Sequence, residues 1–175
     1  MKAFTRTTGR VAVLDRADVD TDQIIPKQFL KRIERTGYGE FLFHDWSQDP
    51  AFELNRPEYA GATILVTGRN FGCGSSREAA PRVIKAAGIA AVVAASFARI
   101  FFRNSINIGL PVLACDTRDI GSGDEIEVDL ASGQVRNLST GASKAVQPLP
   151  KVMMNVIADG GLVQHIRKHG TYRLD

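Results

Sequence analysis

The chain has 175 residues, of which 44% are hydrophobic and 23% are charged, and its formal net charge is +3. This composition predicts one globular domain over residues 1–175, because no linker rich in Pro, Gly or Ser divides the chain. A mean hydropathy of −0.08 argues against a membrane span, and the scattered basic residues argue against a nucleic-acid surface. The first eight residues lack the apolar segment of a secretion signal, so we expect a cytoplasmic protein.

Short β-branched runs alternate with helix-like segments through the first two thirds of the chain. Strands are expected at residues 9–14, 62–67, 89–94 and 111–114. A helix is expected at residues 77–87, where Gly88 ends it, and another at residues 97–108, capped by Ser96. This alternation predicts parallel strands joined by right-handed crossovers, which place the turn after the second strand at a carboxyl edge of the sheet.

The other segments carry weaker patterns. Residues 15–22 are rich in acids and are expected to form a loop, whereas residues 27–35 have the apolar spacing of a helix. Alternating apolar residues at 126–130, followed by a Ser-Gly turn and residues 134–138, predict an antiparallel hairpin. Two closing helices are expected at residues 151–159 and 162–169, on either side of a Gly-Gly pair.

The segment Asn-Phe-Gly-Cys-Gly-Ser-Ser-Arg-Glu at residues 70–78 has the composition of an anion-binding turn. Its two glycines allow backbone N–H groups to approach a ligand closely, and Arg77 offers a planar fork for a carboxylate or a phosphate. The same residues also fit a capping box, in which Ser75 and Glu78 begin the following helix. The turn lacks the spacing of nucleotide-binding loops, so the residues alone leave anion binding and helix capping both open.

The cysteines and histidines give no sign of a metal centre held by this chain alone. Cys73 and Cys115 are far apart, which argues against a disulfide and against a self-contained iron–sulfur or zinc site, and Cys73 is expected to serve packing. His165 and His169 stand four residues apart, a spacing that can bind a metal. Since no third ligand lies near them in the sequence, we expect no metal site and two solvated or helix-end histidines.

Three motifs occur in one order along the chain. They are Val-Asp-Thr-Asp-Gln-Ile-Ile-Pro-Lys-Gln-Phe-Leu at residues 19–30, the turn at residues 70–78, and Ser-Phe-Ala-Arg-Ile-Phe at residues 96–101. Together they resemble the small subunits of bacterial 3-isopropylmalate dehydratases. The resemblance implies an α/β fold, the aconitase-type swivelling domain, with three β/β/α layers and a mainly parallel core sheet. It also implies a heterodimer with a large subunit that carries a [4Fe–4S] cluster, with no cofactor on this chain.

The resemblance implies roles for the residues of the turn. Ser75 matches the catalytic base, Ser76 matches a substrate-binding hydroxyl beside Gly74, and Arg77 matches the arginine that binds a substrate carboxylate. Backbone N–H groups and a guanidinium would stabilise a serine alkoxide, which is otherwise a poor base in water.

Residues of the first motif are expected near this turn. Thr21 and Asp22 either orient Arg77 and contact the substrate or cap the helix that follows Pro26. The next residues are candidates for reading the substrate side chain, although their apolar face could equally belong to the core. These candidates are Phe29, Leu30, Lys31 and Arg32.

The implied reaction is the isomerisation of 2-isopropylmalate to 3-isopropylmalate by dehydration and rehydration, in leucine biosynthesis. One departure concerns the substrate, because Ala79 stands where the family usually has a histidine after Arg-Glu. A related hydro-lyase for another hydroxy-diacid, of the citramalate or dimethylmalate type, therefore stays an alternative. A noncatalytic anion-binding module is a further alternative, which the intact Ser75 argues against.

Overall fold

The computed structural model describes residues 6–31 and 37–171, and its centre is a curled sheet of seven strands. The strands follow the spatial order β4-β3-β2-β1-β5-β6-β7. Their bounds are β1 (Arg6–Leu14), β2 (Ile64–Thr67), β3 (Ala91–Ala94), β4 (Val112–Ala114), β5 (Glu125–Asp129), β6 (Gln134–Asn137) and β7 (Ser143–Ala145).

Strand β1 has a parallel neighbour on one side and an antiparallel neighbour on the other. Its second half pairs in parallel with β2, from Val11 opposite Ile64 onward, and β2, β3 and β4 continue this parallel arrangement. Its first half pairs antiparallel with β5, where Arg6 lies opposite Asp129, and β6 and β7 extend that side. Strand β1 therefore joins a parallel half of the sheet to an antiparallel half.

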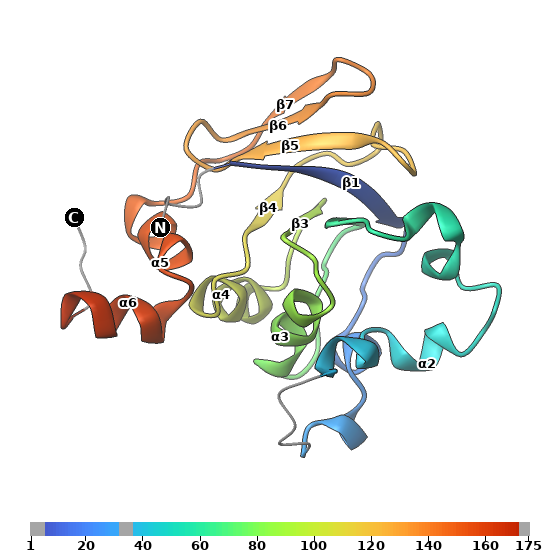
Figure 1. Ribbon diagram of the computed structural model, residues 1–175, viewed down its shortest axis with the longest axis horizontal. Coiled ribbons are helices and arrows are strands. Elements are labelled where there is room, and N and C mark those ends of the chain that lie inside the picture. The colour runs from blue at the N-terminus through green and yellow to red at the C-terminus, as the bar shows by residue number, and fades with distance from the viewer. Residues whose placement is uncertain (1–5, 32–36, 172–175) are drawn as a thin grey trace.

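The helices α3 (Ala79–Ala86) and α4 (Arg99–Asn107) connect the parallel strands and lie together below them in Figure 1, while β5 to β7 curl over the top. The result is the expected three-layer arrangement, with a parallel core and an antiparallel cover. The helices α5 (Lys151–Ala158) and α6 (Leu162–His169) pack beside α4 at the left of Figure 1.

Short helical segments form most of the region between β1 and β2. They are α1 (Thr21–Ile24), α2 (His44–Ser47) and four 3-10 turns: η1 (Lys27–Phe29), η2 (Tyr38–Phe41), η3 (Glu53–Asn55) and η4 (Pro57–Tyr59). The expected helix at residues 27–35 was wrong in its described part, where a single 3-10 turn ends at Phe29. Residues 32–36 of that prediction lie outside the described residues.

The predicted strands, the hairpin and the closing helices are confirmed, with bounds that differ by a few residues. Strand β7 and the short helix α1 were missed. No helix within residues 6–31 and 37–171 is long and apolar enough to cross a membrane.

The core lies on both faces of the parallel strands, between them and the helices on one side and under the antiparallel strands on the other. All four residues of β2 and of β3 are buried, as expected for strands that are covered on both faces. Beneath the glycine turn, the rings of Phe71 and Phe101 meet edge to face, with centroids 5.2 Å apart. Burial of each such side chain contributes about 1.5–3 kcal/mol, which fixes the base of the turn.

Candidate active site

Three loops meet at the carboxyl edge of the parallel strands, and each carries one of the ordered motifs. The loop after β1 touches the loop after β2 through a parallel bridge between Asp20 and Cys73. The loop after β2 touches the loop after β3 through a second bridge, between Phe71 and Phe97. Segments about 25 to 50 residues apart in the chain therefore form one surface, as the predicted topology requires.

The first loop fixes one side of the glycine turn by backbone hydrogen bonds. The N–H of Gly72 donates to the carbonyl of Val19 at 2.8 Å, and the N–H of Thr21 donates to the carbonyl of Cys73 at 2.9 Å. Gly72 has a φ of +82°, and a Cβ there would overlap the ring of Phe101. Only glycine fits this position, because the left-handed backbone and the close ring both exclude a side chain.

The third loop fixes the other side of the turn. The N–H of Ala98 donates to the carbonyl of Phe71 at 2.9 Å, and the N–H of Asn70 donates to the Ser96 hydroxyl at 2.8 Å. The predicted capping role of Ser96 was wrong, since α4 has Ala98 as its N-cap and no side-chain cap. The Ser96 hydroxyl holds the glycine turn instead.

The two serines of the turn are exposed on a backbone that is held from below. Gly74, with a φ of +92°, Ser75 and Ser76 all lie on the surface. The hydroxyl of Thr21, a residue only 3% exposed, donates to the Ser75 carbonyl at 3.0 Å. Thr21 thus positions the backbone of Ser75 while the Ser75 side chain faces the surroundings.

The capping-box interpretation of the turn is wrong. Helix α3 begins at Ala79, two residues later than expected, and its N-cap is Glu78 without a side-chain capping bond. The carboxylate of Glu78 pairs with Arg82 at 2.6 Å along the helix surface. The first turn of α3 also offers one backbone donor fewer than an ordinary helix, because Pro81 has no N–H.

Arg77 is held in place by the loop after β1. Its side chain is 9% exposed, and its Nη1 donates to Oδ1 of Asp22 at 3.0 Å and to the carbonyl of Ile25 at 3.3 Å. Oδ1 of Asp22 also accepts the backbone N–H of Lys27 at 3.2 Å. Asp22 therefore orients Arg77 and also accepts a backbone N–H from the segment after Pro26, while its expected contact with a substrate stays a prediction. The hydrogen bond from Arg77 is the main cause that lowers the pKa of Asp22.

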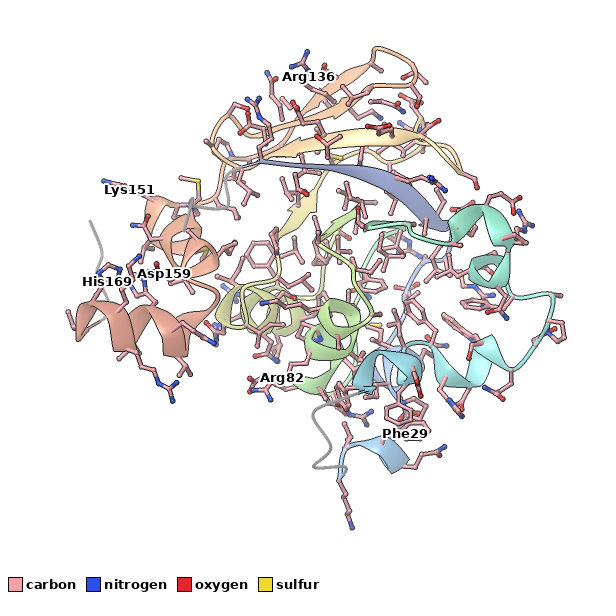
Figure 2. All side chains as sticks on the ribbon, in the orientation of Figure 1. Phe29, Arg82, Arg136, Lys151, Asp159 and His169 are labelled. Atoms are coloured by element: carbon pink, nitrogen blue, oxygen red, sulfur yellow. The ribbon has the colours of Figure 1, made fainter. Side chains whose placement is uncertain are left out.

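The candidates for substrate selection separate in the structure. Phe29 is buried and stacks on Phe41, with centroids 4.1 Å apart, so its ring belongs to the core of this region (Figure 2). Leu30 and Lys31 are exposed, and Arg32 lies outside the described residues. Among the described candidates, Leu30 and Lys31 have exposed side chains, and their role in substrate selection stays a prediction.

The two cysteines are free, and burial is the main cause that raises the pKa of each thiol. A raised pKa disfavours the thiolate, which is the nucleophilic and metal-binding form. This agrees with a packing role for Cys73.

Sequence reasoning missed two residues that shape this surface. Asp20 caps α1 and forms a capping box with Gln23, and this pattern was readable in the sequence as Asp-x-x-Gln. The contact of Ser96 with the turn carried no such local signal, because its partner lies 26 residues away.

Comparison with known sequences places the chain in a family. The family of the aconitase C-terminal domain matches residues 1–117. The chain therefore belongs to the aconitase C-terminal domain family, as the three motifs and the fold indicated.

Individual relatives agree with this assignment. The 3-isopropylmalate dehydratase small subunit of Geobacillus kaustophilus is 56% identical over 126 residues, covering 69% of this chain and 64% of that protein. The match thus spans less than two thirds of that relative's length. The methanogen homoaconitase small subunit of Methanothermobacter thermautotrophicus is 46% identical over 155 residues, covering 86% of this chain and 85% of that protein.

A solved structure shares the fold. The crystal structure of a 3-isopropylmalate dehydratase from Methanocaldococcus jannaschii superimposes with a TM-score of 0.80 at 36% sequence identity. The alignment covers 94% of this chain and 95% of that one, so the antiparallel cover and the parallel core are both included.

Proposed function

We propose that the chain is the small subunit of a hydro-lyase that converts 2-isopropylmalate to 3-isopropylmalate in leucine biosynthesis. The observation that supports this most directly is the pairing of an exposed Ser75 with a buried and oriented Arg77 on one rigid turn. The choice of substrate is supported by the names of the Geobacillus and Methanocaldococcus relatives.

The chain's own residues can support the proton transfers of this reaction. The contacts of Arg77 with other described residues use Nη1 alone, so Nε and Nη2 are available for two parallel hydrogen bonds to a substrate carboxylate. Bound this way, the carboxylate holds its neighbouring carbon near Ser75. As an alkoxide, the Ser75 oxygen takes the proton from that carbon while the hydroxyl leaves the adjacent carbon, and the resulting Ser75 hydroxyl returns the proton when water adds in the opposite sense.

The departing hydroxyl needs an acid, and we assign this role to an iron–sulfur cluster. An iron–sulfur cluster is held by cysteine thiolates, usually four, and this chain has only Cys73 and Cys115. The proposal therefore assigns the cluster to a large subunit, where it would supply a Lewis acid for the hydroxyl. The exposure of Ser75 and Ser76 fits a site that a second protein surface completes.

The homoaconitase relative gives a second candidate substrate class. It is 46% identical to this chain, so this level of likeness is shared by enzymes with different names. We propose that three positions decide between the two substrate classes, namely the exposed Leu30 and Lys31, and Ala79 at the start of α3. A panel of substituted hydroxy-diacids, assayed with the assembled enzyme, distinguishes the two classes.

The test of the proposal compares two serine variants in complex with an iron–sulfur large subunit. Ser75→Ala is expected to lower turnover by roughly 10²–10⁴, the usual contribution of a general base, with stability changed by no more than about 0.5 kcal/mol. Ser122→Ala removes a hydroxyl from an exposed turn before β5 and should leave both quantities unchanged. Turnover by Ser75→Ala at the rate of Ser122→Ala would refute the assignment.

A further inference from the structure

A polar cluster outside the proposed active site joins the last two helices. Asp159 ends α5, and His165 and His169 lie one turn apart on α6. The Oδ2 atom of Asp159 lies 2.8 Å from Nδ1 of His165 and 2.9 Å from Nε2 of His169. Figure 2 shows Asp159 and His169 side by side, where α5 and α6 meet.

The structure corrects the expectation of a solvated or helix-end histidine for His165, whereas His169 is the last residue of α6, as expected. His165 is 1% exposed, and the side chains of Asp159 and His169 are 8% and 25% exposed. Asp159 is a polar partner of both histidines that the sequence pattern did not reveal, because the Gly-Gly pair folds α6 back toward it. Gly161 makes this possible with a φ of +127°.

We propose that Asp159, His165 and His169 bind a divalent transition metal ion of the Zn²⁺ class. One ligand atom from each residue lies within 4.8 Å of the others. A tetrahedral zinc ion with bonds of about 2.0–2.1 Å separates its ligand atoms by about 3.3 Å, so the side chains need only small movements. The ion lies between Oδ2 and the two ring nitrogens that now face it, both nitrogens being unprotonated, and water or another ligand completes the fourth position.

The chemistry of the donors selects the kind of metal. Two imidazoles and one carboxylate suit zinc and its neighbours, whereas magnesium and calcium prefer sites made of oxygen alone. Lys168 donates to the other carboxylate oxygen, Oδ1, at 2.7 Å and leaves Oδ2 to the histidines. Because the Lys168 side chain is 65% exposed, it can withdraw into solvent when a cation enters.

A bound ion would link two helices and stabilise the folded chain. The ion connects the end of α5 to the last turn of α6, and these helices pack against α4 below the parallel sheet. A ligand that binds only the folded chain raises its stability, so zinc should raise the thermal unfolding midpoint.

The test uses the full chain without a histidine tag, stripped with chelator and dialysed against Zn²⁺. The wild type and His44→Gln, which removes the only histidine outside the cluster, should each retain one ion per chain and unfold at a higher temperature with zinc. His169→Gln should bind at least tenfold more weakly, since loss of even an outer-shell partner costs about 10–100-fold. Co²⁺ should give tetrahedral absorption bands with the wild type and not with His169→Gln.

Asp159→Asn is a second variant, which preserves the shape of the side chain and removes its charge, and it should weaken binding to the same extent. Equal zinc affinity of the wild type and His169→Gln would overturn the proposal, as would a wild-type chain that retains no zinc. Both measurements are made on the isolated chain and do not depend on the hydro-lyase assignment.

Discussion

Two arginine–carboxylate pairs lie on the loops around the carboxyl edge of the sheet, and they are built differently. Arg16 donates to both carboxylate oxygens of Glu53, from Nε at 2.8 Å and from Nη2 at 2.9 Å. Its guanidinium also lies 4.1 Å from the centre of the Trp46 ring. Arg77 is more deeply buried, yet its described hydrogen bonds to Asp22 and to the Ile25 carbonyl use Nη1 alone.

The difference separates a structural pair from a pair prepared for a ligand. The fork of Arg16 is filled by one carboxylate and covered by an aromatic ring, an arrangement that stabilises the fold around β1 and η3. The fork of Arg77 is held at one nitrogen, which fixes its direction and leaves two donors for a second carboxylate. Arg77 is therefore a stronger indication of function than Arg16, because it is buried beside exposed hydroxyls and its described contacts leave donors for a ligand.

Among the changes that test this difference, Arg77→Lys is expected to have the largest effect on kcat/KM. In the assembled enzyme, Arg77→Lys loses the two-pronged contact with the substrate, so kcat/KM should fall by about 100-fold or more, with little loss of stability. Arg16→Lys is the matched control, because it should lower stability by about 1 kcal/mol and leave kcat/KM near the wild-type value. Steady-state kinetics and urea unfolding measure the two quantities. Equal effects of the two variants would break the distinction.

Asp22→Asn should have a smaller effect, since Asp22 orients Arg77 through one hydrogen bond. The pKa of Asp22 is lowered by Arg77, so the carboxylate is charged at neutral pH and the amide removes that charge. We expect kcat/KM to fall about tenfold, mainly through a higher KM, and Asp22→Glu to recover part of the loss. Unchanged KM in both variants would mean that Arg77 keeps its orientation without this partner.

The pair of Arg16 and Glu53 makes a prediction about pH. The hydrogen bond from Arg16 is the main cause that lowers the pKa of Glu53 below its ordinary value of 4.5. A depressed pKa in the folded state stabilises the protein above the unfolded-state pKa, and this stability is lost as pH falls through the folded-state value. Glu53→Gln should therefore cost about 1 kcal/mol at pH 7, and the difference from the wild type should shrink below pH 4.5.

Urea unfolding at pH 7 and at acid pH checks this, with Glu58→Gln as a control at an exposed glutamate. A difference that stays constant across the acid range would show that the Glu53 carboxylate is not the source of the stability.

Much of the fold was predictable because it depends on local patterns. The buried runs of β2 and β3 have no polar residue before their ends, and the alternating apolar residues of β5 are both buried, so strand type followed directly from residue type. The glycine turn was placed correctly for the same reason. It follows a parallel strand and precedes a helix, and such a turn lies at the carboxyl edge of the sheet.

The parts that could not be predicted depend on contacts between distant residues. Ser96 precedes a helix and reads as a cap, and only the folded loops show that its hydroxyl meets Asn70. Asp159 reads as a helix end, and only the return of α6 shows its two histidine partners. The orientation of Arg77 by Asp22 was predicted only in part. The motif suggested it, but the residues left helix capping by Asp22 equally open.

Strand β1 has a consequence for how the domain unfolds. Its first five residues, Arg6 to Arg10, hydrogen-bond with β5, and its last four, Val11 to Leu14, with β2. Neither half of the sheet can open fully without releasing a strand that the other half needs. We therefore expect the antiparallel cover and the parallel core to exchange their amide hydrogens through one shared opening reaction, as a single cooperative unit.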